Sequence, residues 1–110
     1  MTIRSQLLKG ILEGCILIII SRSTVYGYEL SMKLQDYGLT VSEGSIYPVL
    51  LRMQKDDLIK GNMQPSPNGP NRKYYHLTDK GVEALDLFKT HWEGIKHPVD
   101  RLLQDEGDRT

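Results

Sequence analysis

The sequence is poor in the features that mark secreted or membrane-bound chains. Its single cysteine, Cys15, cannot form an internal disulfide, and we expect this side chain to be a small core residue in a reducing compartment. The longest uninterrupted apolar run covers only residues 15–20, whereas a membrane-spanning helix needs about 20 apolar residues. We therefore expect a cytoplasmic protein with no membrane partner.

Net charge is also lacking, because 14 basic residues balance 14 acidic ones in a chain of 110 residues. The distribution of the charges is uneven. Residues 44–76 carry a balance of +3 and residues 79–110 a balance of −3, while residues 1–43 are neutral. The middle of the chain can therefore face phosphate groups, and the C-terminal part cannot.

Catalytic and metal-binding patterns are missing as well. There is no glycine-rich phosphate loop, and the serines have no evident base partner. His91 and His97 are six residues apart, which does not place them on one helical face, and His76 is remote from both. We expect no enzymatic activity, no metal site and no cofactor.

Helical periodicity is present in the first half of the chain. A helix is predicted over residues 3–21, and its apolar residues fill two adjacent rows, so a partner subunit is the natural second cover for it. A second helix is predicted over residues 25–37, with Thr24 as its N-cap and Gly38 as the residue that ends it. Its expected inward-facing residues are Leu30, Leu34 and Tyr37.

A third helix is predicted to follow after a connection of three residues. Ser42 is its expected N-cap, and it runs to about Asp56. Its expected inward-facing residues are Ile46, Val49, Leu50 and Met53. Two short helices joined by a tight, glycine-containing turn indicate a helix-turn-helix unit.

A β-hairpin pattern comes next. Two predicted strands, residues 58–64 and 72–77, flank a loop of turn-forming residues at 65–71. In the second strand, alternation places Arg72, Tyr74 and His76 on one face, and Lys73, Tyr75 and Leu77 on the other. A strand, a polar loop and a strand after a helix-turn-helix unit predict a wing.

The last predicted helix is capped by Thr78 and carries apolar residues at alternating gaps of three and four. This heptad seam consists of Leu85, Phe88, Trp92, Ile95, Val99 and Leu102. Pro98 lies inside the seam and is expected to kink it. A seam of this kind predicts that the helix pairs two copies of the chain into a homodimer.

The expected fold class is mainly α with a small β-hairpin. Residues 1–78 form a winged helix-turn-helix domain, residues 79–105 a C-terminal dimerisation helix, and residues 106–110 a frayed tail.

The outward face of the third helix is typical of a recognition helix, with small residues near its N-terminus and cations further along. Hydroxyl groups can donate to phosphates, and Arg52 can pair with a phosphate or read a guanine edge. The candidate DNA-contacting residues are Ser42, Ser45, Tyr47, Arg52 and Lys55, together with Asn71, Arg72 and Lys73 of the wing. Plainer interpretations stay open: a solvated helix face with Ser42 only as a cap, a half-buried packing role for Tyr47, and wing cations that serve solubility.

Trp92 is the only tryptophan and falls near the middle of the seam. If the seam joins two copies, Trp92 can meet its own counterpart across a two-fold axis. One interpretation is an interface anchor. The other is a pair of indoles that line a pocket for a flat aromatic small molecule.

Three segments resemble the PadR family of bacterial transcriptional regulators, specifically its short type with a single C-terminal helix. Residues 26–30 (YGYEL) are similar to the opening of the family's second helix, and residues 42–50 (SEGSIYPVL) to its recognition helix. Residues 72–81 (RKYYHLTDKG) are similar to the strand that leaves the wing and enters the last helix. One departure is Leu51, where the family often has lysine. The resemblance implies a dimeric repressor that leaves its operator when a small molecule or signal arrives.

Two hypotheses for function follow. The first is a sequence-specific DNA-binding transcriptional regulator, whose two recognition helices read a pseudo-palindromic operator in double-stranded DNA. The second is a winged-helix module that binds another protein and no DNA, which the zero net charge and the apolar Leu51 favour.

Overall fold

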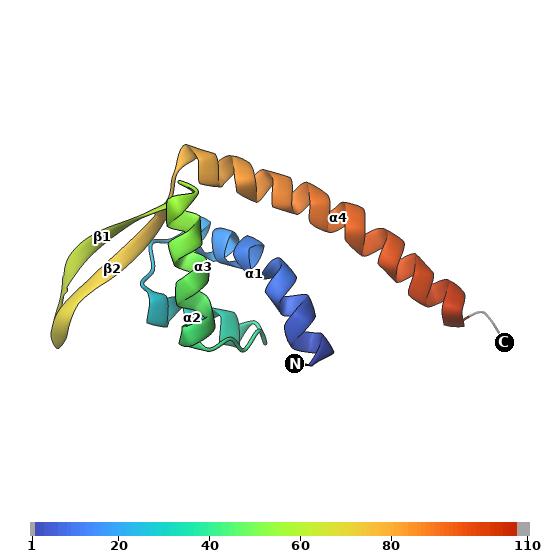
Figure 1. The fold of residues 1–110 in the computed structure, drawn as a ribbon, viewed down its shortest axis with the longest axis horizontal. Helices are drawn as coiled ribbons and strands as arrows, with labels where there is room; N and C mark the ends of the chain where they lie inside the picture. The colour runs from blue at the N-terminus through green and yellow to red at the C-terminus, as the bar shows by residue number, and fades with distance from the viewer. Residues whose placement is uncertain (1, 108–110) are drawn as a thin grey trace.

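The computed structural model describes residues 2–107 and contains four helices and one antiparallel hairpin (Figure 1). In chain order the elements are α1 (Ile3–Arg22), α2 (Gly27–Asp36), α3 (Glu43–Lys55), β1 (Ile59–Ser66), β2 (Gly69–Leu77) and α4 (Asp79–Gly107). In Figure 1 the hairpin and α4 project to opposite sides of a body formed by α1, α2 and α3. This arrangement is a winged helix-turn-helix fold with an added C-terminal helix, as predicted.

Side-chain caps fix where three of the helices begin. The Thr2 Oγ1 accepts a hydrogen bond from the Ser5 amide at the start of α1, at 3.0 Å. The expected caps of α3 and α4 are confirmed: the Ser42 Oγ accepts from the Ser45 amide at 3.2 Å, and the Thr78 Oγ1 accepts from the Gly81 amide at 3.0 Å. Each cap satisfies an amide that has no partner within its helix.

The start of α2 differs from the prediction. Thr24 does not cap it, because Val25 is extended and its carbonyl oxygen accepts a hydrogen bond of 2.8 Å from the Tyr75 amide of β2. The helix therefore begins two residues later, at Gly27. Its end also differs, since Tyr37, expected to face inward, is the C-cap and is 69% exposed. Gly38 ends the helix as predicted, with a φ of +86° that suits glycine.

The wing is longer than predicted. The residues expected to form the loop at 65–71 belong mostly to strands, so that only Pro67 and Asn68 separate β1 from β2. Arg72 is paired with Gln64, and the register shifts once between Gln64 and Ser66, at Pro65. Proline has no amide hydrogen to donate, and a two-stranded sheet tolerates it where the pairing is irregular.

The core lies where α1, α2 and α3 meet the base of the wing. Its most deeply buried side chains are Ile16, Val25, Leu30, Leu34, Ile46, Leu50, Met53 and Ile59. Gly14 of α1 leaves room for the Phe88 ring, because a methyl group there would overlap that ring. Leu85 belongs to the same core and is 6% exposed. The first turns of α4 are therefore anchored on their own protomer.

Beyond Phe88 the helix α4 leaves the body, and each side chain from Lys89 to Asp105 is exposed. The helix continues through Pro98 to Gly107, and Figure 1 shows a gentle curve in place of the expected kink. The proline removes one amide donor from the helix without ending it. Residues 108–110 of the expected frayed tail lie outside the described residues.

Cys15 is half-buried at the side of the core, and burial raises the pKa of its thiol. Its packing agrees with the expected role as a small core residue. Among the described residues, no helix combines the length and the apolar character needed to cross a membrane.

Candidate nucleic-acid interface

Helix α3 has a buried face and an exposed face, as a recognition helix requires. Ile46, Leu50 and Met53 are buried in the core. The opposite face exposes Gly44, Pro48, Leu51 and Lys55. Leu51 is 61% exposed, so the middle of this face is apolar and its C-terminal end is cationic. This face can enter a groove without displacing any part of the core.

The two serines at the start of α3 lie together. Their Oγ atoms are 3.0 Å apart, and Ser42 also caps the helix. Both residues are exposed. A hydroxyl that accepts from the backbone keeps a hydrogen to donate, so the capping role and a phosphate contact are compatible.

Tyr47 packs against the beginning of α2. A Cβ atom on Gly27 would lie 2.8 Å from the Tyr47 hydroxyl oxygen, so any larger residue there would require this ring to shift. The Tyr47 hydroxyl donates to Glu43 Oε2 at 3.3 Å, and the side chain remains 48% exposed. Partial burial, and then the neighbouring negative charge of Glu43, raise the pKa of Tyr47. The phenol is thus a protonated donor at neutral pH, held beside the recognition face.

A groove of about 630 Å³ separates the first half of α1 from the start of α3. Two cations line it, Lys9 from α1 and Arg52 from α3, together with the hydroxyl-bearing residues Ser5, Thr40, Ser42 and Ser45. The Arg52 guanidinium lies 3.7 Å from Glu13 Oε1, and the Arg52 side chain is 59% exposed while that of Glu13 is 39% exposed. An exposed ion pair of this kind contributes little to stability, so Arg52 can exchange Glu13 for a phosphate.

Lys9 is a residue that the sequence analysis missed. It lies on α1, whose pattern indicated only a wide apolar face, and nothing in the spacing placed it opposite α3. The charge of residues 1–43 is balanced, so regional charge gave no signal either.

The wing presents its cations on two faces, as the alternation predicted. The Arg72 guanidinium carbon lies 4.4 Å from the centre of the Tyr26 ring on one face. On the other face, the Lys73 side chain crosses Gly61, and its Nζ lies 5.8 Å from the centre of the Tyr75 ring. Asn71 is exposed nearer the tip. Both cations therefore lie over aromatic rings, from positions in the outer half of the hairpin.

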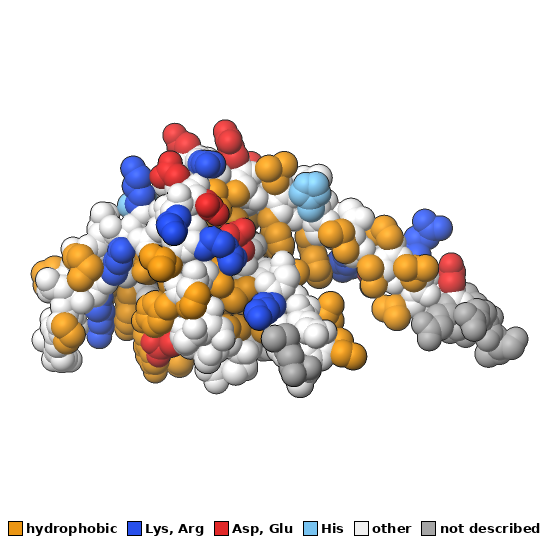
Figure 2. Space-filling view, in the orientation of Figure 1, with side chains coloured by type: hydrophobic (Ala, Val, Ile, Leu, Met, Phe, Trp, Pro, Cys, Tyr) orange, Lys and Arg blue, Asp and Glu red, His pale blue; other side chains and the backbone are white. Residues whose placement is uncertain are grey.

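The predicted seam of α4 is divided by the structure. Leu85 is covered by the protomer's own core, and Phe88 is partly covered by α1. The rest of the seam is exposed: Trp92 at 40%, Val99 at 46%, Ile95 at 59% and Leu102 at 69%. Figure 2 shows hydrophobic side chains at intervals along the projecting part of α4.

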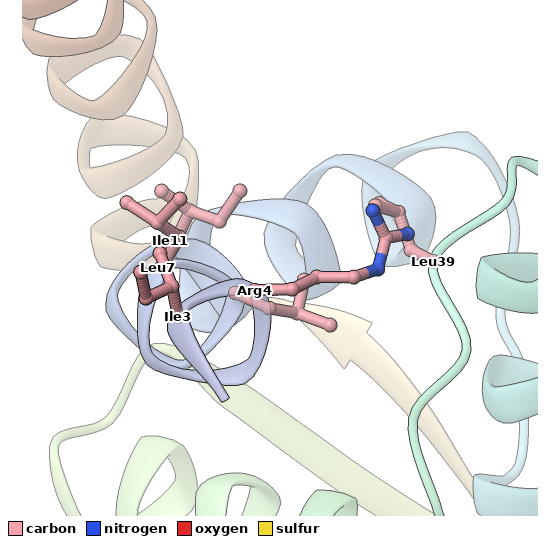
Figure 3. Close-up of a pocket in the computed structure, with 6 residues that line it drawn as sticks. Ile3, Arg4, Leu7, Ile11 and Leu39 are labelled. Atoms are coloured by element: carbon pink, nitrogen blue, oxygen red, sulfur yellow. The ribbon is translucent and has the colours of Figure 1, made fainter. Parts of the chain in front are cut away.

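A second exposed apolar surface lies on the first half of α1. Ile3 and Leu7 are 76% and 68% exposed, and they line a pocket of about 340 Å³ with Ile11 and Leu39. In Figure 3 the side chains of Ile3, Leu7 and Ile11 project together from α1, while Arg4 reaches toward Leu39. The Arg4 guanidinium donates to the Gly38 carbonyl oxygen at 2.7 Å and closes that side of the pocket.

Comparison with known proteins places the chain in one family. Residues 16–87 match the PadR-like family of transcriptional regulators. The crystal structure of a PadR-like transcriptional regulator from Bacillus cereus is 61% identical and superposes with a TM-score of 0.82, covering 90% of this chain and 97% of that one. A Streptococcus transcriptional regulator is 43% identical with a TM-score of 0.79, over 88% and 96% of the two chains. The chain belongs to the PadR-like family of transcriptional regulators.

A more distant structure, Bacillus subtilis PadR in complex with operator DNA, shares the fold. It is 23% identical with a TM-score of 0.65, over 69% of this chain and 45% of that one.

Proposed function

We propose that this chain is a sequence-specific DNA-binding transcriptional repressor that acts in the cytoplasm, where bacterial operators lie. The observation that carries the proposal is the outer face of α3, which is exposed while its inner face is buried in the core. Cationic elements flank it: the groove with Lys9 and Arg52 on one side, and the wing with Arg72 and Lys73 on the other. The more distant fold relative bound to operator DNA supports the same use of this fold.

The proposed division of labour follows from the chemistry of each part. The cations and hydroxyls position the protein on the phosphate backbone, and the side chains on the outer face of α3 reach the base edges in the major groove. Lys9 joins the residues proposed from the sequence, namely Ser42, Ser45, Tyr47, Arg52, Lys55, Asn71, Arg72 and Lys73. Leu51 offers an apolar contact, of the kind that suits a thymine methyl group.

The proposed active form is a homodimer that binds a pseudo-palindrome. Its interface uses Trp92, Ile95, Val99 and Leu102 of α4, which the protomer leaves exposed. The apolar surface of α1 around Ile3 and Leu7 extends it. A second chain would remove this apolar surface from water, and two-fold symmetry would place two copies of α3 at a fixed spacing.

The proposed effector is a flat aromatic molecule that binds between the two Trp92 side chains of the dimer. Trp92 is 40% exposed in the protomer, so its indole is available for a ligand or for its own counterpart. The other proposed role, an interface anchor without a ligand, uses the same exposure.

A protein-binding module without DNA contact is the second candidate, and the 61% exposure of Leu51 favours it. A mobility-shift assay on the DNA upstream of the protein's own gene, repeated over a range of salt concentrations, separates the two. Binding that weakens steeply with salt supports the proposed function, because each phosphate contact releases bound cations. No shift at low salt would overturn it.

A further inference from the structure

Tyr26 lies at the centre of an aromatic cluster between the start of α2 and the wing, outside the set of candidate DNA-contacting residues. The Arg72 guanidinium lies over its ring, with the guanidinium carbon 4.4 Å from the ring centre. The Tyr74 ring meets it edge-on at 5.4 Å and 64°, and the Tyr28 ring stacks at 6.4 Å and 25°. Both geometries are favourable for aromatic pairs.

The backbone around Tyr26 is fixed from two directions. Its amide donates to Glu29 Oε1 at 3.3 Å, and its carbonyl oxygen accepts from the Leu30 amide at 3.0 Å. The preceding residue, Val25, is hydrogen-bonded to Tyr75 of β2 and is only 1% exposed. The Tyr26 backbone is therefore fixed beside the strand that carries Arg72, and its ring contacts Tyr74 of that strand.

A ring that contacts the flat face of a guanidinium leaves the edge of that guanidinium free to donate. The five N–H donors of arginine lie in the guanidinium plane, so a ring above that plane does not compete with them. Within the part of the chain that the structure describes, no carboxylate forms a salt bridge with Arg72. A guanidinium with its plane fixed and its edge free is the arrangement that binds a phosphate through two parallel hydrogen bonds.

We propose that Tyr26 is a positioning residue for DNA binding: its ring orients the Arg72 guanidinium so that the free edge meets a backbone phosphate beside the recognition helix. The inference rests on the proposed function and adds a role for the YGYE segment. In that segment Tyr26 orients the wing cation, Gly27 admits the Tyr47 ring, and Glu29 fixes the Tyr26 backbone. The segment thereby ties both DNA-contacting elements to α2.

The test is a double-mutant cycle between Tyr26 and Arg72, measured by fluorescence anisotropy on a labelled 30-base-pair duplex of mixed sequence over a salt series. Tyr26→Phe keeps the ring and should bind as the wild type does. Tyr26→Leu removes it and should weaken binding roughly two- to fivefold for each wing, the range expected for a cation–π contact at an exposed site. In the Arg72→Ala background, Tyr26→Leu should have no further effect. Arg72→Lys should lose affinity too, because lysine lacks the planar fork.

The outcomes separate the two proposals. If the wild type does not bind the duplex even at low salt, the proposed function and this inference both fail. If the wild type binds, and Tyr26→Leu weakens binding equally with and without Arg72, the inference alone is overturned. The inference would also be overturned if Tyr26→Phe weakened DNA binding as much as Tyr26→Leu, or if Arg72→Lys bound DNA as tightly as the wild type. Circular dichroism of each variant checks that the fold is intact. If Tyr26→Leu does not fold, the DNA affinities of Tyr26→Phe and Arg72→Lys decide whether the inference stands, because the first should equal that of the wild type and the second should be lower.

Discussion

The body of the protein buries its regularly spaced apolar residues, whereas the projecting part of α4 leaves its own exposed. In the body, the residues at helical spacing on α2 and α3 are almost fully buried within one chain, as Leu30, Leu34 and Ile46 show. In α4, residues at equally regular spacing are exposed, from Trp92 at 40% to Leu102 at 69%. The same sequence pattern therefore corresponds to a core in one region and, in the other, to an exposed apolar surface that we propose as the dimer interface.

The largest predicted effect comes from charged residues placed in the exposed seam of α4. Trp92→Glu combined with Ile95→Glu should convert the proposed dimer into monomers, because each carboxylate would have to be desolvated against apolar partners. Sedimentation velocity at micromolar concentration gives the oligomeric state. The matched control is Thr90→Glu with His97→Glu, which adds the same residues at exposed sites on the other side of α4. A wild-type protein that sediments as a monomer would contradict the prediction.

The second prediction concerns the cations of α3 and of the wing. Arg52→Ala, Lys55→Ala, Arg72→Ala and Lys73→Ala in one protein should weaken DNA binding strongly. They should also flatten the dependence of log K on log salt by roughly one unit for each lost phosphate contact. Mobility shifts over a salt series measure both quantities.

The control for the cation variants removes Lys89 and Lys96, two exposed cations of α4, and should leave affinity and slope nearly unchanged. Lys9→Ala alone should flatten the slope in the same way as a single member of the set. Wild-type affinity in the quadruple variant would show that these residues do not contact DNA.

Two glycines test the difference between the packed start of α4 and its projecting part. A methyl group at Gly81 would overlap the Leu58 carbonyl oxygen, whereas a methyl group at Gly94 would meet no described atom within 4 Å apart from its chain neighbours and its own helix backbone. Gly81→Ala should therefore lower the free energy of unfolding by about 1–3 kcal/mol, the usual effect of overpacking. Gly94→Ala should raise it by about 0.5–1 kcal/mol, because alanine favours a helix. Urea denaturation at one fixed protein concentration measures both. If both substitutions changed the free energy of unfolding in the same direction, the two parts of α4 would not be packed differently.

Local signals predicted most of the fold. Hydroxyl residues before apolar periodic segments indicated the caps at Ser42 and Thr78, and the glycine that ends α2 was visible as well. The failures came from contacts between distant segments. Val25 is drawn out of the helix by its bond to Tyr75, and the proline-, glycine- and asparagine-rich segment at 65–71 is pulled into the hairpin by strand pairing.

The candidate site was predictable only in part, for the same reason. The outward residues of α3 follow from the period of one helix, and the two faces of the wing follow from the period of one strand. Lys9 lines the same groove as Arg52, and Tyr26 lies beneath Arg72, so each pair joins two elements that are far apart in the sequence. No spacing rule relates such pairs, so only the packed structure brings them together.

The smallest expected effect belongs to the proposed ligand site at Trp92. Large rings at a two-fold axis cannot interdigitate as aliphatic side chains do, so two facing indoles would pack imperfectly and leave room for a flat molecule. Stacking adds about 0.5–1.5 kcal/mol for an aromatic pair beyond the burial of area. Such a ligand would weaken DNA binding only by favouring a different spacing of the two α3 helices. Thr78 and Gly81 fix the start of α4 to the Asp57 and Leu58 backbone, so a change in how the helices cross would reach the wing.

Tryptophan fluorescence during titration with planar aromatic compounds measures binding, since Trp92 is the only tryptophan. Trp92→Phe, which keeps a smaller ring, should bind more weakly than the wild type when followed by calorimetry. Unchanged emission across a broad panel of compounds would leave Trp92 as an interface anchor without a ligand.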